Sequence, residues 1–235
     1  MPLSWRAKKQ LTFFFVFAGA VFLLVFGIIY LFRSPAPPPA PELPDGEDLV
    51  VFWARFFQIA PGHYEVSALV ENPNLLLGTD RLTYRLRLYD QNNILIALRE
   101  GRIFANPREK FLIYEPDIRT FERSPVRAAV EFLDVPWKRI EKERAELLVA
   151  KKDFSNSETG GRLRVLAQNQ SLFAVKNVFL SAVLLDKDGN ALGVSVSKIS
   201  EIPGEGEREV VFTWREAFDP SPVSIEVLTR TNLTE

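Results

Sequence analysis

The sequence predicts an all-β protein of two tandem β-sandwich domains, preceded by one N-terminal transmembrane α-helix. Three observations predict this fold class: an uncharged apolar run, a proline-rich segment directly after it, and a strand pattern that occurs twice in the rest of the chain. The expected parts are a cytoplasmic N-terminus (1–10), a transmembrane helix (11–33), a proline-rich stalk (34–47) and two β-sandwich domains (48–140 and 141–235).

The composition excludes several classes of function. Of the 235 residues, 47% are hydrophobic and 25% are charged, which is close to the globular average and sufficient for a packed core. The chain has no Cys and one His, so disulfides and thiolate sites are excluded and imidazole chemistry is nearly so. All four charges in residues 1–33 are basic, which leaves the remainder acidic at −5. This balance argues against binding to nucleic acid.

The apolar run is long enough to cross a bilayer. From Leu11 to Phe32 there is no charge, and Thr12 is the only clearly polar side chain. A helix of this length extends about 33 Å, which matches a hydrocarbon core of ~30 Å. A cleaved signal peptide would have a shorter apolar region of ~7–15 residues. We therefore expect an uncleaved signal anchor in contact with membrane lipid.

The flanking charges predict the direction of insertion. Arg6, Lys8 and Lys9 precede the helix, whereas Arg33 is the one basic residue that follows it before a group of acidic residues. The positive-inside rule then places the N-terminus in the cytoplasm. The domains after the helix are expected on the extracytoplasmic side of the cell membrane.

The segment from Ser34 to Gly46 reads SPAPPPAPELPDG and has six prolines between Pro35 and Pro44. Proline at this density prevents helix and sheet and favours an extended polyproline II spacer. A stalk is therefore the expected role, with a proline-rich ligand for an aromatic-lined domain as the alternative.

The rest of the chain repeats one pattern at a spacing of 97 residues. Glu71-Asn72-Pro73 precedes Gln168-Asn169-Gln170 by that distance, and Ser124-Pro125-Val126 precedes Ser221-Pro222-Val223 by the same distance. Between these markers, the segment 82–90 alternates apolar and polar residues with the period of a half-buried strand. It ends at Asp90, before residues that favour a hairpin turn, as the matching segment 178–186 does at Asp186.

Further strands follow from alternation and from the turn residues between the apolar runs. In the first unit they are expected at 50–57, 64–70, 94–103, 111–114 and 126–132, and in the second at 147–151, 162–167, 191–199, 209–214 and 223–228. Six or seven short strands in a unit of about 97 residues fit an immunoglobulin-like β-sandwich.

Each unit resembles the FxLYD group of extracytoplasmic domains. The resemblance lies in an Asn at a strand end, a strand that closes on Leu88-Tyr89-Asp90 or Leu185-Asp186, a turn, and Pro107 or Pro203 before a further apolar strand. It covers about 60 residues of each unit. The resemblance implies an immunoglobulin-like sandwich outside the cell and transfers no catalytic residues.

Three short motifs are candidates for sites of chemistry. His63 follows Pro61-Gly62 in an expected turn, without a second imidazole to share a metal. The segment 186–190 resembles the start of a calcium loop, but its Gly and its last ligand are misplaced, so a hairpin turn is expected. The Ser-x-x-Lys motif at 195–198 lies in an expected strand without its partner motifs. We therefore predict no catalytic, cofactor-binding or metal-binding residue.

Two surface features are candidates for interaction. Arg81, Arg85 and Arg87 lie on the outward face of the first unit's long strand, where a solvated face is the expected role and an anionic partner is the alternative. The matching strand of the second unit is apolar on both faces and has Phe179, Val183 and Leu185 on the second of them. That face must be covered by the neighbouring domain, by a partner or by the sandwich itself.

These observations lead to three hypotheses about function. The first is a membrane-anchored extracytoplasmic interaction or structural protein that presents tandem β-sandwich domains to a protein partner, without catalysis or cofactor. The alternative is a bitopic subunit of an envelope machine such as a secretion or pilus assembly complex. The third, an enzyme, would have to build its site from carboxylates and hydroxyls.

Overall fold

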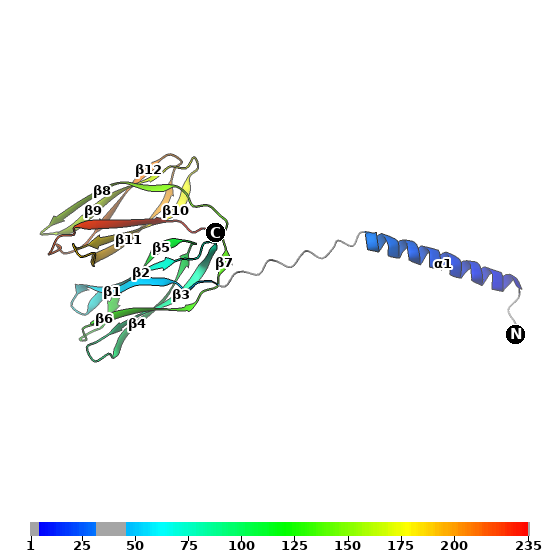
Figure 1. The fold of residues 1–235 in the computed structure, drawn as a ribbon, viewed down its shortest axis with the longest axis horizontal. Helices are drawn as coiled ribbons and strands as arrows, with labels where there is room; N and C mark the ends of the chain where they lie inside the picture. Colours follow the sequence, from blue (N-terminus) through cyan, green and yellow to red (C-terminus); the bar gives the residue numbers. More distant parts are fainter. Residues whose placement is uncertain (1–4, 32–45, 235) are drawn as a thin grey trace. The chain divides into compact units, whose positions relative to one another are not determined.

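The computed structural model describes residues 5–31 and 46–234 (Figure 1). The first four residues of the expected cytoplasmic N-terminus lie outside the described residues, as does the expected stalk up to residue 45. The chain divides into two compact units, Met1–Glu42 and Leu43–Glu235, which are considered separately.

The first unit contains helix α1 (Trp5–Leu31). Apolar side chains surround its axis, and Phe13, Phe17 and Leu24 are among those exposed. Its segment Lys8–Tyr30 is long and apolar enough to cross a membrane. An apolar N-terminal helix is therefore confirmed, and it begins six residues earlier than the apolar run because the basic residues before Leu11 are also helical. Residues 32 and 33 of the predicted span lie outside the described residues.

In the second unit, antiparallel strands form four sheets among the described residues, two in each half of the unit. We call residues 46–140 the first half and residues 141–234 the second half. The first half contains β1 (Val50–Ala60), β2 (His63–Asn72), β3 (Leu77–Tyr89), β4 (Leu95–Ala105), β5 (Glu109–Arg119), β6 (Arg127–Asp134) and the short β7 (Lys138–Arg139). The second contains β8 (Leu147–Ser157), β9 (Gly160–Asn169), β10 (Val175–Leu185), β11 (Ala191–Ile202), β12 (Glu207–Thr213) and β13 (Ser224–Arg230).

The strand order is the same in the two halves. In the first half the sheets are β1-β2-β5 and β4-β3-β6, with β7 paired to β3. In the second half they are β8-β9-β12 and β11-β10-β13, so β1 to β6 correspond in order to β8 to β13. The predicted strands are confirmed, although β8 ends six residues later than predicted, and β3 and β5 are each five residues longer at one end. The short β7 was not predicted because two charged residues carry no strand signal.

Each half has its own apolar core between its two sheets. In the first half the alternation of β3 turns Leu82, Leu86 and Leu88 inward against Val66 and Phe111. The second core gathers the corresponding side chains of β9, β10 and β12, which are Leu163, Val165, Leu180, Ala182 and Phe212. Burial of these side chains is the main favourable contribution to folding in each half.

A buried asparagine fixes the same loop in each half. The Nδ2 of Asn72 donates to the carbonyls of Leu77 and Asn106, both at 2.8 Å. Its counterpart Asn169, 97 residues later, donates to the carbonyls of Phe173 at 2.8 Å and Pro203 at 3.0 Å. The two asparagines that are 97 residues apart in the sequence therefore make equivalent hydrogen bonds in the two halves.

The hairpin turns after β3 and β10 are also confirmed. The Oδ1 of Asp90 accepts hydrogen bonds from the backbone N–H groups of Asn92 and Ile94. The Oδ1 of Asp186 accepts them from Asp188 at 2.8 Å and Asn190 at 2.7 Å, and the bond from Asn190 contributes most to lowering the pKa of Asp186. Each carboxylate therefore closes a turn, as Asp residues commonly do.

Asn169→Ala should reduce the free energy of unfolding by about 2 kcal/mol, because buried carbonyls would lose their donor. Asn72→Ala should cost a similar amount in the first half. Denaturant unfolding followed by tryptophan fluorescence measures both, with the exposed neighbour Gln170→Ala as a control that should change little. An unchanged midpoint in Asn169→Ala would contradict the role of this side chain.

Candidate functional site

The two halves pack face to face through one sheet each (Figure 1). Leu69 and Leu112 of the sheet β1-β2-β5 meet Val183, Ala191 and Val194 of the sheet β11-β10-β13 in a third apolar cluster. The strands β2, β5 and β10 therefore bury both of their faces, one in the core of their own half and one in this interface. Packing of two sheets through their apolar faces is the arrangement expected for such strands.

Hydrogen bonds and ion pairs surround this apolar cluster. Lys110 on β5 forms an ion pair with Glu226 on β13 at 2.8 Å, and both side chains are about one-third exposed. Arg55 on β1 donates to the Oδ1 of Asn190 at 2.6 Å. The side chain of Asn106 binds the segment after β13, since its Nδ2 donates to the carbonyl of Thr231 at 2.8 Å.

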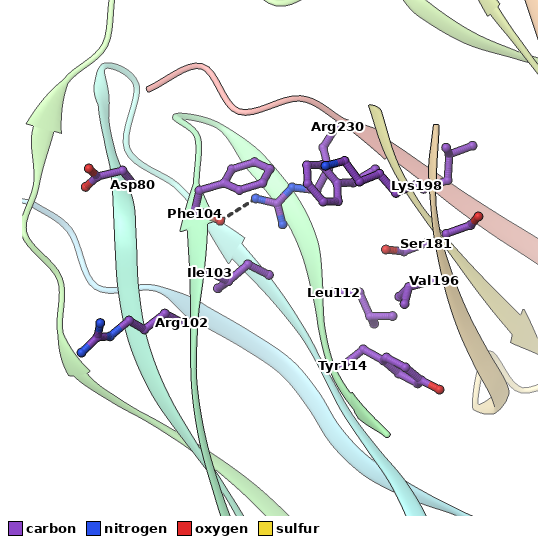
Figure 2. A pocket seen from close by; sticks show the side chains of 13 residues that line it. Asp80, Arg102, Ile103, Phe104, Leu112, Tyr114, Ser181, Val196, Lys198 and Arg230 are labelled. Atoms are coloured by element: carbon purple, nitrogen blue, oxygen red, sulfur yellow. Dashed lines mark hydrogen bonds between the residues drawn. The ribbon is translucent and has the colours of Figure 1, made fainter. Parts of the chain in front are cut away.

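The most buried ion pair of the interface joins Arg230 to Glu109 at 2.8 Å, with side chains that are 5% and 6% exposed. Arg230 Nη2 also donates to the carbonyl of Phe104 at 2.6 Å, and the guanidinium lies 3.9 Å from the centre of the Phe104 ring (Figure 2). Burial lowers the pKa of Arg230 to about 10, against the opposing effect of Glu109. Arg230 therefore stays protonated at neutral pH.

At one edge of the interface the two halves leave a cleft of ≈ 590 Å³ (Figure 2). We call it the inter-half cleft. It is mostly apolar, with Ile103 and Phe104 on β4, Leu112 on β5, and Phe179 and Val196 on β10 and β11. The rings of Phe104 and Phe179 lie 5.5 Å apart and join the two walls.

Polar side chains also line the inter-half cleft. Ser181 is 6% exposed, and its hydroxyl makes no hydrogen bond to any described residue. Arg230 lines the cleft too, and its Nε is a buried donor without a partner among the described residues. Lys198 lies with its Nζ 5.1 Å from the centre of the Phe179 ring. Asp80 pairs with Lys138 at 2.8 Å, and this hydrogen bond lowers the pKa of Asp80.

The structure places the three apolar candidates from the sequence on the interface. Val183 is fully buried against the first half, and Leu185 packs beside it. Phe179 lies further along the same face of β10 and lines the inter-half cleft. Of the three alternatives for this face, cover by the neighbouring half is the one the structure contains, so Val183 is not an exposed surface.

The three arginine candidates lie apart from this interface on the other sheet of the first half. Arg85 forms an ion pair with Glu100 of β4 at 2.9 Å, and Arg87 forms one with Glu131 of β6. Arg81 is exposed and makes no ion pair with any described residue. Two of the three arginines therefore form ion pairs with residues on neighbouring strands. Cross-strand ion pairs of this kind are common on exposed sheet faces.

A second cleft of ≈ 780 Å³ lies between the halves and contains His63. Nδ1 of His63 lies 2.6 Å from Asp117 Oδ1, a contact that lowers the pKa of Asp117. Ser195 lines the same cleft, but no hydroxyl of the described residues forms a hydrogen bond with His63. The pair therefore lacks a positioned nucleophile. In the described part of the chain, no group of three or more His, Cys, Asp or Glu side chains could hold a metal ion.

Comparison with the known protein families and with curated proteins finds no match for this chain.

Sequence reasoning did not identify Arg230, Glu109 or Phe104 as parts of an interface. Charged residues at strand ends are common on surfaces, so nothing in their local pattern indicates burial. A usable signal lay in β2 and β5, where Leu69 and Leu112 interrupt the alternation and make both strand faces apolar, as in β10. Three such strands together would have indicated that the halves pack on each other.

Proposed function

We propose that this chain is a membrane-anchored extracytoplasmic interaction protein that presents two tandem immunoglobulin-like sandwiches as one docked unit, without catalysis. The observation that carries this proposal is the interface itself. Two halves of equal strand order are fixed face to face around Val183 and the buried pair Arg230–Glu109. A docked pair of this kind offers surfaces that neither half has alone, which suits a binding role.

The strand order supports the immunoglobulin-like assignment. An immunoglobulin sandwich pairs its strands A-B-E in one sheet and C-F in the other. Here β1-β2-β5 and β4-β3-β6 have the corresponding connectivity, and the second half repeats it. The FxLYD resemblance implies the same class of domain, and the buried Asn72 and Asn169 give its Asn a structural role at the end of β2 and β9.

The apolar helix supports the membrane anchor. Helix α1 has apolar side chains all around its axis and a length that matches a bilayer core. The basic residues Arg6, Lys8 and Lys9 at its start favour a cytoplasmic N-terminus. The strands would then lie outside the membrane, where the proline-rich segment would act as a spacer.

Protease added to intact cells should digest residues 46–235 and leave a fragment of about 30 residues that contains α1, because the bilayer protects the helix. Mass spectrometry of the membrane fraction measures this fragment, and a cytoplasmic protein serves as the control for intact cells. Digestion of the strands only after lysis would reverse the proposed orientation.

Mild crosslinking in the same cells tests what the docked halves bind. Recovery of one partner through residues of the docked halves supports an interaction protein. A fixed set of several subunits would instead favour the envelope machine.

A further inference from the structure

We propose that the inter-half cleft binds a single-chain anionic amphiphile of the long-chain carboxylate type, with its headgroup beside Lys198 and its chain along the apolar wall. This inference rests on the proposed function, in which a membrane tether keeps the cleft close to a source of amphiphiles. It adds the chemical class of a ligand to the binding role.

The size and the lining of the cleft fit the apolar part of such a ligand. Its volume of ≈ 590 Å³ lies within the range of about 300–1,000 Å³ typical of small-molecule sites. Ile103, Leu112 and Val196 provide aliphatic contacts, and Val196 is 43% exposed although it lies on the interface side of β11. An acyl chain over these residues would remove apolar surface from water, which favours binding.

The buried polar atom of the cleft lining that lacks a partner is a donor. The Arg230 Nε belongs to a side chain that is 5% exposed, and it finds no acceptor among the described residues. A buried donor without an acceptor is unfavourable and calls for an explanation. A ligand oxygen placed against Arg230 would give this donor an acceptor, whereas a purely apolar ligand would not.

The charges of the cleft favour an anionic headgroup. Lys198 and Arg102 are exposed cations on its two walls, and neither makes an ion pair with a described residue. The carboxylates of Asp80 and Glu109 are already paired, with Lys138 and Arg230 respectively. Because Glu109 neutralises Arg230, the charge left beside Phe179 is that of Lys198. A carboxylate headgroup beside Phe179 would pair with Lys198 through a charge-assisted hydrogen bond.

The test uses the full chain in phosphatidylcholine vesicles with a palmitate that carries a photoactivatable diazirine on its chain. After irradiation, mass spectrometry locates the label. We expect label on peptides that contain Phe104, Leu112 and Val196, in addition to label on α1 from probe dissolved in the bilayer. The corresponding long-chain alcohol should label α1 equally and the cleft peptides much less.

Charge reversal tests the headgroup site. Lys198→Glu should reduce the label on the cleft peptides about tenfold, because it replaces attraction of the carboxylate with repulsion. Lys187→Glu, at an exposed turn of the same half, is the matched control and should leave the label unchanged. Label on α1 should be the same in all three proteins.

Each outcome has a defined meaning. Cleft peptides without label, or with label that is equal in Lys198→Glu and the original chain, would overturn the ligand assignment and leave the cleft as an incompletely filled interface. Label on α1 beside an unlabelled cleft would overturn this inference alone. An α1 without label would instead count against the membrane anchor and thus against the proposed function.

Discussion

Replacing Arg230 with methionine should lower the free energy of unfolding of the docked halves by about 3–5 kcal/mol, because it leaves the buried carboxylate of Glu109 without its partner. The rings of Phe104 and Phe111 lie against the guanidinium, and both charged side chains are almost fully buried. The Phe104 carbonyl would lose its donor as well. Denaturant unfolding of the full chain in detergent, followed by tryptophan fluorescence, measures the loss.

The matched control is the neighbouring ion pair of the same interface. Lys110 and Glu226 are about one-third exposed, so Lys110→Ala should cost less than about 1 kcal/mol. The double variant Arg230→Met with Glu109→Gln should recover a large part of the stability that Arg230→Met loses, since it removes the unpaired charge. Equal costs for Arg230→Met and Lys110→Ala would contradict the importance of burial for this pair.

Val183→Glu should separate the two halves without unfolding either of them. Val183 is fully buried, but its contacts belong to the interface with the first half and not to the core of the second half. If the halves stayed docked, burying a carboxylate there would cost about 4 kcal/mol or more. The chain avoids this cost when the two halves separate and the carboxylate is exposed to water. We expect faster proteolysis in the segment 141–146 and unchanged β-structure by circular dichroism.

Leu180→Glu is the control for a charge in the core of the second half. Leu180 is equally buried on the same strand, but it points between the two sheets of its own half. Its replacement should unfold the second half and give an insoluble product. Similar results for Val183→Glu and Leu180→Glu would mean that the interface and the core are one cooperative unit.

The alternation of apolar residues predicted most of the fold because each strand has one face in the core of its own half. In β3, for example, Leu82, Leu86 and Leu88 are inward as their spacing of two predicts. The turns after β3 and β10 followed from Asp90 and Asp186, whose side chains bind the backbone a few residues later. Such local interactions are visible in a single stretch of sequence.

The interface and its cleft could be predicted only in part because they depend on residues far apart in the chain. The apolar second face of β10 indicated that Phe179, Val183 and Leu185 are covered, but it did not identify the first half as the cover. The pair Arg230–Glu109 joins residues 121 positions apart in sequence, and each is an ordinary surface residue by its local pattern. Lys198 became a candidate headgroup residue because the structure places its Nζ beside the Phe179 ring in the cleft.

The central claim is that residues 46–234 form two sandwiches, each with its own core, that dock through the Val183 face. Thermal melts of residues 48–140 and 141–235, expressed separately and followed by circular dichroism, test this most directly. Because each half contains a complete pair of sheets around its own core, we expect two soluble, β-rich proteins with cooperative melts, each less stable than the docked unit. If neither segment folds without the other, the chain contains one domain and the claim is wrong.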